Sequence, residues 1–270
     1  MKLILMGTND FVVPIFDDLS NKHDIIGVFT RAPKPMGRKH ILTLSPVHVW
    51  AQSRGLTVHT SIKEFDLINE KPDMIVVISY GVILRDNVLN AAPCINIHPS
   101  SLPKYRGPSP IKTAILNGDE TMDVCLMQMT DELDAGDVYM RKNISIDEND
   151  NNETLENKVS AVAIEMLNEY LQNPEKYPAI PQSGEPIYTR KFTGDNEIID
   201  WNKTPQQIHN QIRALSCGRT KINGVDVKIL ETKIENGELK IIKIQPSGKK
   251  PMDWKSFVNG LRGAEIRYGE

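Results

Sequence analysis

The residues best suited to chemistry in this sequence lie between Asn96 and Pro103, after a short apolar run. Asn96, Ile97 and His98 alternate polar, apolar and polar, so on an extended strand the amide and the imidazole share one face. An amide can donate a hydrogen bond to a developing oxyanion, and an imidazole can move a proton or stabilise charge. Taken alone, His98 is better interpreted as a structural histidine than as a catalytic one. Its same-face partner Asn96 favours a catalytic role.

A carboxylate that orients the imidazole is the expected third member, and the segment Leu133–Asp137 offers Asp134 and Asp137. Either aspartate could instead be a turn residue beside Gly136. The sequence has no Gly-x-Ser-x-Gly elbow, no cysteine next to a histidine and no HExxH motif, which disfavours a covalent nucleophile or a metal. These residue types suit direct acyl transfer to an amine through a tetrahedral intermediate, without naming the acyl group.

The elements that must position these side chains are predicted to be parallel strands. Lys2 to Met6 and Ile25 to Thr30 flank a helix that ends near Leu19, and Met74 to Ile78 forms the most apolar strand. This order predicts an α/β fold with an open, mostly parallel, doubly wound sheet, in which ligands bind at the carboxyl ends of strands. Residues 31–44 are rich in Lys, Arg, Pro and Gly, and predict an exposed basic loop.

A cluster of prolines between positions 174 and 186 predicts a linker at about residues 172–190. We therefore expect a catalytic domain over residues 1–190 and a small domain over residues 191–270. The second domain begins with a helix at about Pro205 to Leu215. Short alternating runs separated by glycines follow the helix, as in a small β-barrel.

The chain has 270 residues and a net charge of −3, and its charges are unevenly spread. From Asp200 onward there are 13 lysines and arginines against 8 acidic residues, which hints at a polyanionic partner.

The three cysteines lack metal-ligand spacing and are expected to be free thiols in or near the core. No apolar run is long enough for a signal peptide or a membrane span, so we expect a cytoplasmic protein that does not bind membranes.

Two motifs give the sequence a family resemblance. Asn96 to Pro103, followed by Tyr105-Arg106-Gly107, resembles the formyltransferase signature Asn-x-His-x-Ser-Leu-Leu-Pro, and Leu133–Asp137 resembles that family's Leu-Asp-x-Gly-Asp loop. Over nearly the whole chain, the similarity extends to the methionyl-tRNA formyltransferases. The segments that carry this wider similarity are residues 7–11, 35–38, 45–47, 79–84, 127–129, 199–201 and 245–252.

The resemblance implies transfer of a formyl group from 10-formyltetrahydrofolate to methionyl initiator tRNA. We also expect a monomer, and the lack of metal-ligand motifs predicts that it uses no metal. The resemblance further implies a formyltransferase Rossmann-like domain followed by a small OB-like β-barrel that binds tRNA. Asn96, His98 and Asp134 would be catalytic, and Arg38 would contact the acceptor end of the tRNA. The folate would be bound by two segments, whose residues are Tyr80, Gly81, Val82, Leu84, Ser100, Ser101, Leu102 and Pro103.

The sequence departs from the family pattern at three places. Ser101 replaces the usual first leucine of the signature, and Asn9 replaces a proline of the opening turn. The region between Val227 and Gln245 is shorter than usual, which predicts a shortened barrel. Two other functions stay open: a formyltransferase for an amino sugar nucleotide or glycinamide ribonucleotide, and a catalytically silent tRNA- or folate-binding protein. The intact set of Asn96, His98 and Asp134 disfavours the silent binder.

Overall fold

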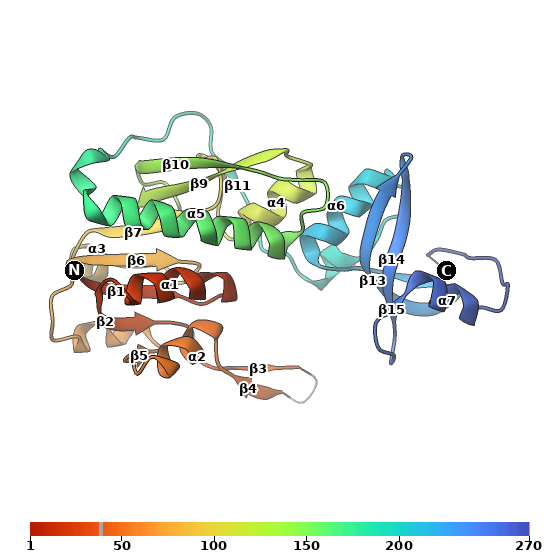
Figure 1. Cartoon of the computed structure of the whole chain (residues 1–270), viewed down its shortest axis with the longest axis horizontal. Helices are drawn as coiled ribbons and strands as arrows, with labels where there is room; N and C mark the ends of the chain where they lie inside the picture. The colour runs from red at the N-terminus through yellow and green to blue at the C-terminus, as the bar shows by residue number, and fades with distance from the viewer. Residues whose placement is uncertain (38–39, 270) are drawn as a thin grey trace. The chain divides into compact units, whose positions relative to one another are not determined.

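The computed structural model describes residues 1–37 and 40–269, so Arg38 lies outside the described residues (Figure 1). The chain divides into two compact units. Unit 1 comprises residues 1–108, 123–144 and 156–188, and unit 2 comprises residues 109–122, 145–155 and 189–270. The predicted boundary between residues 190 and 191 stays a prediction.

Unit 1 is built on a seven-stranded sheet with the order β10-β9-β7-β6-β1-β2-β5. The strands from β5 to β7 are parallel, and β9 is antiparallel to β7. This confirms the predicted α/β fold with a mostly parallel sheet. The strand bounds are β1 Lys2–Gly7, β2 Asp24–Phe29, β5 Val58–His59, β6 Met74–Ile78, β7 Cys94–His98, β9 Thr121–Gln128 and β10 Val138–Ser145.

Helices cover the sheet because the central strands are apolar on both faces. All five residues of β6 are buried, as are all five of β7. Helices α1 and α5 lie side by side over one face in Figure 1, where Asn168 Nδ2 donates to Asp18 Oδ2 at 2.7 Å. The helices are α1 Val13–Ser20, α2 Pro46–Ser53, α3 Asp86–Leu89 and α5 Asn152–Gln172, with 3-10 turns at Asp10–Val12, Ile62–Leu67 and Pro174–Lys176.

The predicted loop at residues 31–44 is wrong in part, because it contains a β-hairpin. Strand β3 (Lys34–Met36) pairs with β4 (Ile41–Thr43) in antiparallel register, with Pro35 opposite Leu42. An isolated two-stranded ribbon has free edges on both sides, so a proline without an N–H is tolerated there. The prolines and the glycine of this segment are typical of loops, so the sequence did not predict these two strands.

The proline-rich segment after α5 is attached to unit 1 by backbone hydrogen bonds. Ile180 and Val138 exchange two such bonds, at 2.9 and 3.0 Å. Strand β11 (Ile187–Tyr188) runs parallel to β8 (Lys104–Arg106), and Ile187 N donates to Pro103 O at 3.2 Å. We call residues 178–188 the strap. The segment predicted as a linker is therefore ordered against the stretch that follows His98.

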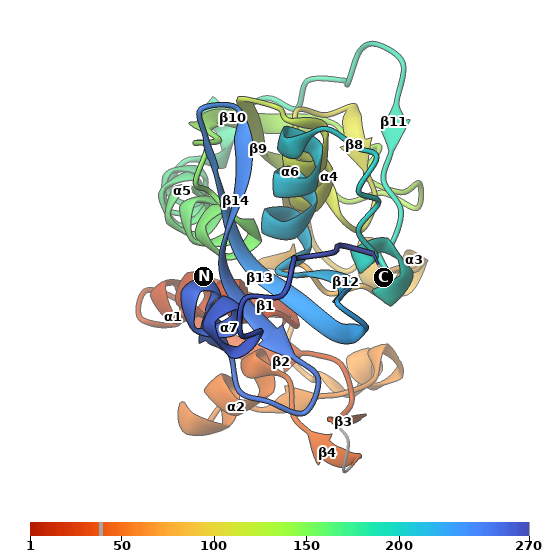
Figure 2. The same cartoon turned by 90° about the vertical axis from the view of Figure 1, so that its right-hand side faces the viewer.

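Unit 2 packs helix α6 (Pro205–Leu215) against a four-stranded antiparallel sheet with the order β12-β13-β14-β15. The helix lies at the predicted residues, and Thr204 caps it by accepting from Gln207 N. Ile208 and Ile212 pack on Ile229 and Ile241 of the sheet. Figure 2 shows β13 and β14 as a long twisted ribbon. The elements are α4 Pro110–Asn117, a 3-10 turn Gly194–Glu197, α6, β12 Gly218–Ile222, β13 Val225–Glu235, β14 Glu238–Pro246, β15 Met252–Asp253 and α7 Trp254–Gly260.

The small sheet confirms the predicted β-strands of the C-terminal region. Its β12 edge is extended by two single bridges, one from Ile198 to Arg219 and one from Ile222 to Tyr268. The bridges cover backbone groups that an exposed edge strand would leave unpaired.

The three cysteines are free and buried, as predicted. Burial raises the pKa of the Cys94 thiol to about 12 and that of Cys125 to about 11, because a thiolate is poorly solvated in the core. These thiols are therefore unsuited to nucleophilic catalysis near neutral pH. Within residues 1–37 and 40–269, no helix is both long enough and apolar enough to cross a membrane.

Candidate active site

Asn96 and His98 lie on the last strand of the parallel part of the sheet. Both are on β7 and both are buried, with 8% and 5% of their surface exposed. Asn96 is opposite Val77 of β6 and Met127 of β9, and His98 is opposite Cys125. Because the two residues are two apart on one strand, their side chains lie on the same face. The structure thus agrees with the predicted placement of the amide beside the imidazole.

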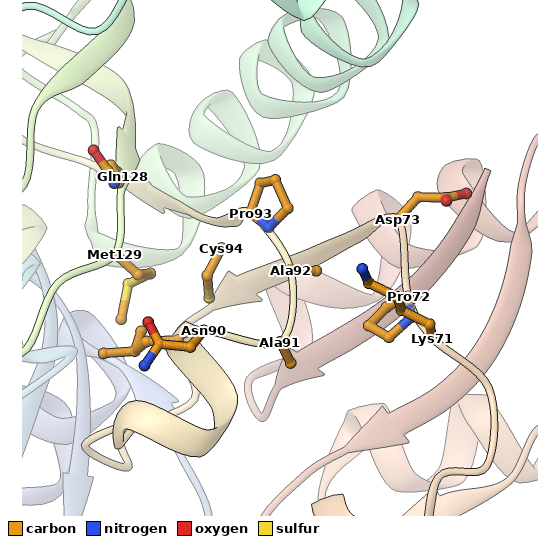
Figure 3. Close-up of a pocket in the computed structure, with 11 residues that line it drawn as sticks. Lys71, Pro72, Asp73, Asn90, Ala91, Ala92, Pro93, Cys94, Gln128 and Met129 are labelled. Carbon is orange, nitrogen blue, oxygen red and sulfur yellow. The ribbon is translucent and has the colours of Figure 1, made fainter.

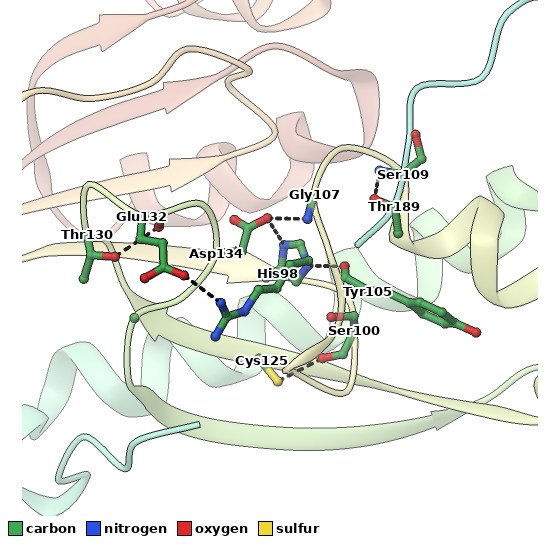
Figure 4. A network of polar contacts seen from close by, with 12 residues as sticks. His98, Ser100, Tyr105, Gly107, Ser109, Cys125, Thr130, Glu132, Asp134 and Thr189 are labelled. Atoms are coloured by element: carbon green, nitrogen blue, oxygen red, sulfur yellow. Dashed lines mark hydrogen bonds and ion pairs between the residues drawn. The ribbon is translucent and has the colours of Figure 1, made fainter. Parts of the chain in front are cut away.

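The two ring nitrogens of His98 have different neighbours (Figure 4). Nε2 lies 3.0 Å from the carbonyl oxygen of Tyr105, and Nδ1 lies 3.7 Å from Oδ2 of Asp134. A carbonyl oxygen can only accept, so this hydrogen bond assigns a proton to Nε2. The remaining nitrogen, Nδ1, faces the carboxylate. Of the two aspartates predicted as candidates, the ring therefore pairs with Asp134.

The loop that carries Asp134 approaches His98 in a tight turn. Asp134 has φ of 49°, in the left-handed region, and its Oδ2 accepts from the backbone N–H of Gly107 at 2.7 Å. A Cβ atom on Gly136 would lie 2.0 Å from the carbonyl oxygen of Gln128. Only glycine fits there, because β9 passes directly against the loop. The glycine that marked a turn in the sequence thus allows the close approach of the loop to β9.

Gly136→Ala is expected to displace the Asp134 loop and to lower the activity of the site strongly. The added methyl cannot coexist with the Gln128 carbonyl, and such overpacking costs about 1–3 kcal/mol of stability. Activity and the midpoint of thermal unfolding can be measured on the same preparation. The matched control is Gly260→Ala in α7, where a Cβ would meet no atom within 4 Å. Full activity in Gly136→Ala would contradict the packing described here.

The side-chain amide of Asn96 is available to a ligand. Among the described residues, none forms a hydrogen bond with this amide. A buried polar group usually has a partner, so a free amide beside a paired histidine is typical of a site that completes its hydrogen bonds with a substrate. The arrangement offers one side-chain amide, one imidazole and one carboxylate at a strand end.

The residues predicted to line the folate site fall into two groups. The exposed or half-buried group consists of Gly81, Val82, Ser101 and Pro103, with 42% of Val82 exposed. The buried group consists of Tyr80, Leu84, Ser100 and Leu102. Side chains of the second group are packed in the interior beneath the two segments. Burial also raises the pKa of the Tyr80 hydroxyl to about 12. Contact with a ligand by side chains is therefore open chiefly to Val82, Ser101 and Pro103, whereas Gly81 can offer only its backbone.

The departure at Ser101 has a structural role. Its hydroxyl accepts from the backbone N–H of Asp123 at 3.1 Å, which ties the segment after His98 to β9. Asn9, the departure in the opening turn, donates from Nδ2 to the hydroxyl of Ser79 at 2.7 Å. It thereby joins the end of β1 to the segment that begins at Tyr80. Neither contact could be predicted from the sequence, because each joins segments that are distant along the chain.

A cavity of about 630 Å³ lies at the other end of β7 (Figure 3). It is lined by Lys71–Asp73, by Leu89–Cys94 and by Gln128 and Met129. Cys94 begins β7 and His98 ends it, so about 13 Å of strand separates the two positions. None of the predicted site residues lines this cavity.

The profiles of two known protein families match this chain. The profile of the family described as "Formyl transferase" matches residues 1–171, and "Formyl transferase, C-terminal domain" matches residues 191–240. The chain belongs to the formyl transferase family, and it is a transferase enzyme. More narrowly, its family is that of the methionyl-tRNA formyltransferases, because relatives of that name match almost its full length.

Two such relatives illustrate the match. The methionyl-tRNA formyltransferase of Ehrlichia chaffeensis is 36% identical over 297 residues, covering 96% of this chain and 97% of that protein. That of Bacillus pumilus is 33% identical over 309 residues, covering 100% and 96%. Similarity this long in both partners includes both units of the present chain.

Solved structures share the fold. Methionyl-tRNA formyltransferase from Clostridium thermocellum has a TM-score of 0.66 at 16% identity, with 91% of this chain and 98% of that chain covered. An N-formyltransferase from Helicobacter canadensis, in complex with folinic acid and dTDP-3-aminofucose, has a TM-score of 0.68 at 21% identity, with 87% and 88% covered. At these identities the likeness shows the fold alone.

Proposed function

We propose that this chain transfers the formyl group of 10-formyltetrahydrofolate to the amino group of methionyl initiator tRNA, for translation initiation. The observation that most supports this acceptor is the match to proteins named methionyl-tRNA formyltransferase over nearly the whole of both chains. The site supports the reaction type, because it presents an amide, an imidazole and a carboxylate, and the thiol opposite His98, that of Cys125, has a pKa raised to about 11 by burial and is unsuited to nucleophilic attack. We also propose that the protein works as a cytoplasmic monomer.

In the proposed reaction, the methionyl amine attacks the formyl carbon and a new C–N bond forms. The formyl oxygen becomes an oxyanion, and the N–H groups of Asn96 stabilise it, since this amide has no partner among the described residues. The bond between the formyl carbon and N10 of the folate then breaks. The amine loses one proton and N10 gains one, so the step is balanced without an oxidant or a metal.

His98 is the group proposed to manage that proton. Its Nδ1 faces Asp134 at 3.7 Å, and its Nε2 donates to Tyr105 O. The carboxylate lies on the side of the ring where positive charge develops when His98 takes up the amine proton. The Gly107 N–H holds that carboxylate in place. Asp134 thus supports the imidazole during transfer.

Unit 2 has a surface suited to a phosphate backbone. Arg219 of β12 is directly opposite Lys228 of β13, and both side chains are exposed. Two positive charges placed opposite one another repel, which destabilises the free protein. A bound polyanion would reduce this repulsion. This pair supports the proposal that the unit binds the tRNA backbone.

Arg38 is proposed to contact the acceptor end of the tRNA, on the basis of the resemblance of residues 35–38. Arg38→Ala is expected to raise KM for tRNA by about 10- to 100-fold, the loss of a hydrogen bond to a charged group. The dissociation constant for folate is expected to change less than about twofold, since this contact would involve only the tRNA. Lys63→Ala, at an exposed position of unit 1, is the control. Equal losses of folate and tRNA binding would remove Arg38 from this role.

The acceptor is tested with a panel. Purified protein and 10-formyltetrahydrofolate are incubated with methionyl initiator tRNA, methionyl elongator tRNA, glycinamide ribonucleotide or an amino sugar nucleotide, and formylated product is measured by mass spectrometry. We expect product from the initiator tRNA. Formylation of only the nucleotide or the sugar would show the alternative function. Thermal stabilisation by folate and tRNA without any product would indicate a silent binder.

A further inference from the structure

We propose that Gln182 of the strap is a positioning residue for formyl transfer, because it holds the turn that presents Asp134 to His98. The inference rests on the proposed function of the site. Gln182 lies outside the family signature and inside the segment that the sequence predicts as a linker. Its side chain nevertheless contacts the backbone of the catalytic loop directly.

One side of the Gln182 amide spans the turn. Nε2 donates to the carbonyl oxygen of Asp134 and to that of Gly136, each at 2.8 Å. These two carbonyls flank Ala135, so a single side chain closes the turn and uses both of its protons. Asp134 has the left-handed backbone conformation that non-glycine residues rarely adopt. The two hydrogen bonds therefore fix a conformation that the loop would not favour by itself.

The other side of the amide is held by Arg106. Gln182 Oε1 accepts from Arg106 Nε at 3.1 Å and from Nη2 at 2.9 Å. The Arg106 side chain is only 10% exposed, and Nη1 pairs with Glu132 at 3.1 Å. Flipping the amide would direct two N–H groups at a guanidinium and an oxygen at two carbonyls. The network thus allows one orientation of Gln182.

The network connects both catalytic side chains through three consecutive residues. Tyr105 accepts from His98, Arg106 binds Gln182, and the Gly107 N–H binds the Asp134 carboxylate. Gln182 then holds the backbone of Asp134, which completes a ring of contacts. A positioning error of about 1 Å can lower a rate by about 100-fold. Loss of Gln182 should therefore lower the rate of transfer, because the distance between Asp134 and His98 would no longer be fixed.

Two variants test the proposal in the formylation assay with 10-formyltetrahydrofolate and methionyl initiator tRNA. Gln182→Ala is expected to lower kcat by up to about 100-fold, with KM for tRNA within about twofold of the wild type. Gln182→Glu keeps the size and the contact with Arg106, but it directs one carboxylate oxygen instead of an NH2 group at the two carbonyls, so kcat should fall at least as much. Gln172→Ala, the same change at an exposed position of α5, is the control. Unchanged kcat in Gln182→Ala would overturn the proposal.

A double-mutant cycle separates positioning from general stability. In an Asp134→Asn background, Gln182→Ala should have less than about threefold further effect on kcat, because the group that it positions is already disabled. Full additivity of the two losses would show that Gln182 acts elsewhere, and would overturn the proposal.

Hydrogen exchange followed by mass spectrometry gives a readout that needs no acceptor. Gln182→Ala should speed exchange in the peptide that covers residues 130–137, with β6 and β7 protected as in the wild type. Unchanged exchange in that peptide would overturn the positioning role. If the wild type forms no formylated tRNA, the proposed function fails, and the exchange result still decides whether Gln182 holds the loop.

Discussion

Replacing His98 with alanine is expected to lower formyl transfer by about 10²- to 10⁴-fold, the usual contribution of a general acid–base group. The imidazole is the only described side chain that pairs with Asp134 at the end of β7, and Nδ1 is 3.7 Å from that carboxylate. In the proposed mechanism, its removal takes away the group that accepts the amine proton. The measurement is single-turnover formylation of methionyl initiator tRNA at saturating 10-formyltetrahydrofolate.

Binding must be measured beside this rate. The affinity of His98→Ala for tRNA should stay within about threefold of the wild type, because the imidazole is buried and its absence leaves the basic surfaces unchanged. His23→Ala, before β2, is the matched control and should keep full activity. A His98→Ala enzyme with more than a tenth of the wild-type rate would exclude His98 as the proton carrier.

Asn96→Asp is expected to cost at least about 10²- to 10³-fold in kcat, the effect of removing one oxyanion donor. The substitution keeps the shape of the side chain but replaces its NH2 group by one oxygen, and an ionised carboxylate would also repel the developing negative charge. Asn96→Ala removes the donor without adding charge, so it should be the more active of the two variants. Comparing the rates of both variants tests the sign of the charge that Asn96 faces.

Folding controls decide how this comparison is interpreted. Asn96 is 8% exposed, so a buried carboxylate can also destabilise the sheet, and thermal unfolding must be followed for both variants. Asn173→Asp makes the same change at an exposed position and should be neutral. Equal activity of Asn96→Asp and the wild type, in folded protein, would exclude the oxyanion role.

The parts of the fold that could be predicted from the sequence depend on local pattern. The apolar run Met74–Ile78 is long and continuous, so its assignment as a central strand is confirmed. The helix at Pro205–Leu215 has an N-cap, a proline at its first position and an apolar face, and it is confirmed at the same residues. The hairpin of β3 and β4 was missed because Pro33, Pro35 and Gly37 indicate a turn-rich loop.

The catalytic set could be proposed from the sequence because the chemistry of each member is visible in its type and motif. The alternation of Asn96 and His98 predicts a shared face, and that placement depends only on strand geometry. The choice of Asp134 over Asp137 required the resemblance, and the distance of 3.7 Å between Asp134 Oδ2 and His98 Nδ1 supports it. The catalytic roles themselves stay predictions.

Contacts between distant segments could not be predicted. Gln182 is 48 residues from Asp134, and Asn9 is 70 residues from Ser79. Polar side chains in loops are usually solvated, so their types alone do not reveal a partner. Only the fold, which brings the strap beside β8, makes Gln182 a candidate.

The strap also bears on where the first domain can be separated from the second in evolution. The family profile of the first domain stops at residue 171, whereas the groups that close the Asp134 turn and pair with β8 lie at Gln182 and Ile187. A gene fusion that joined a foreign domain directly after α5 would preserve the sheet but remove the hydrogen bonds from Gln182 to the Asp134 turn. If Gln182 positions Asp134 as proposed, we expect an exchanged acceptor domain to be compatible with catalysis only when it is joined downstream of Tyr188.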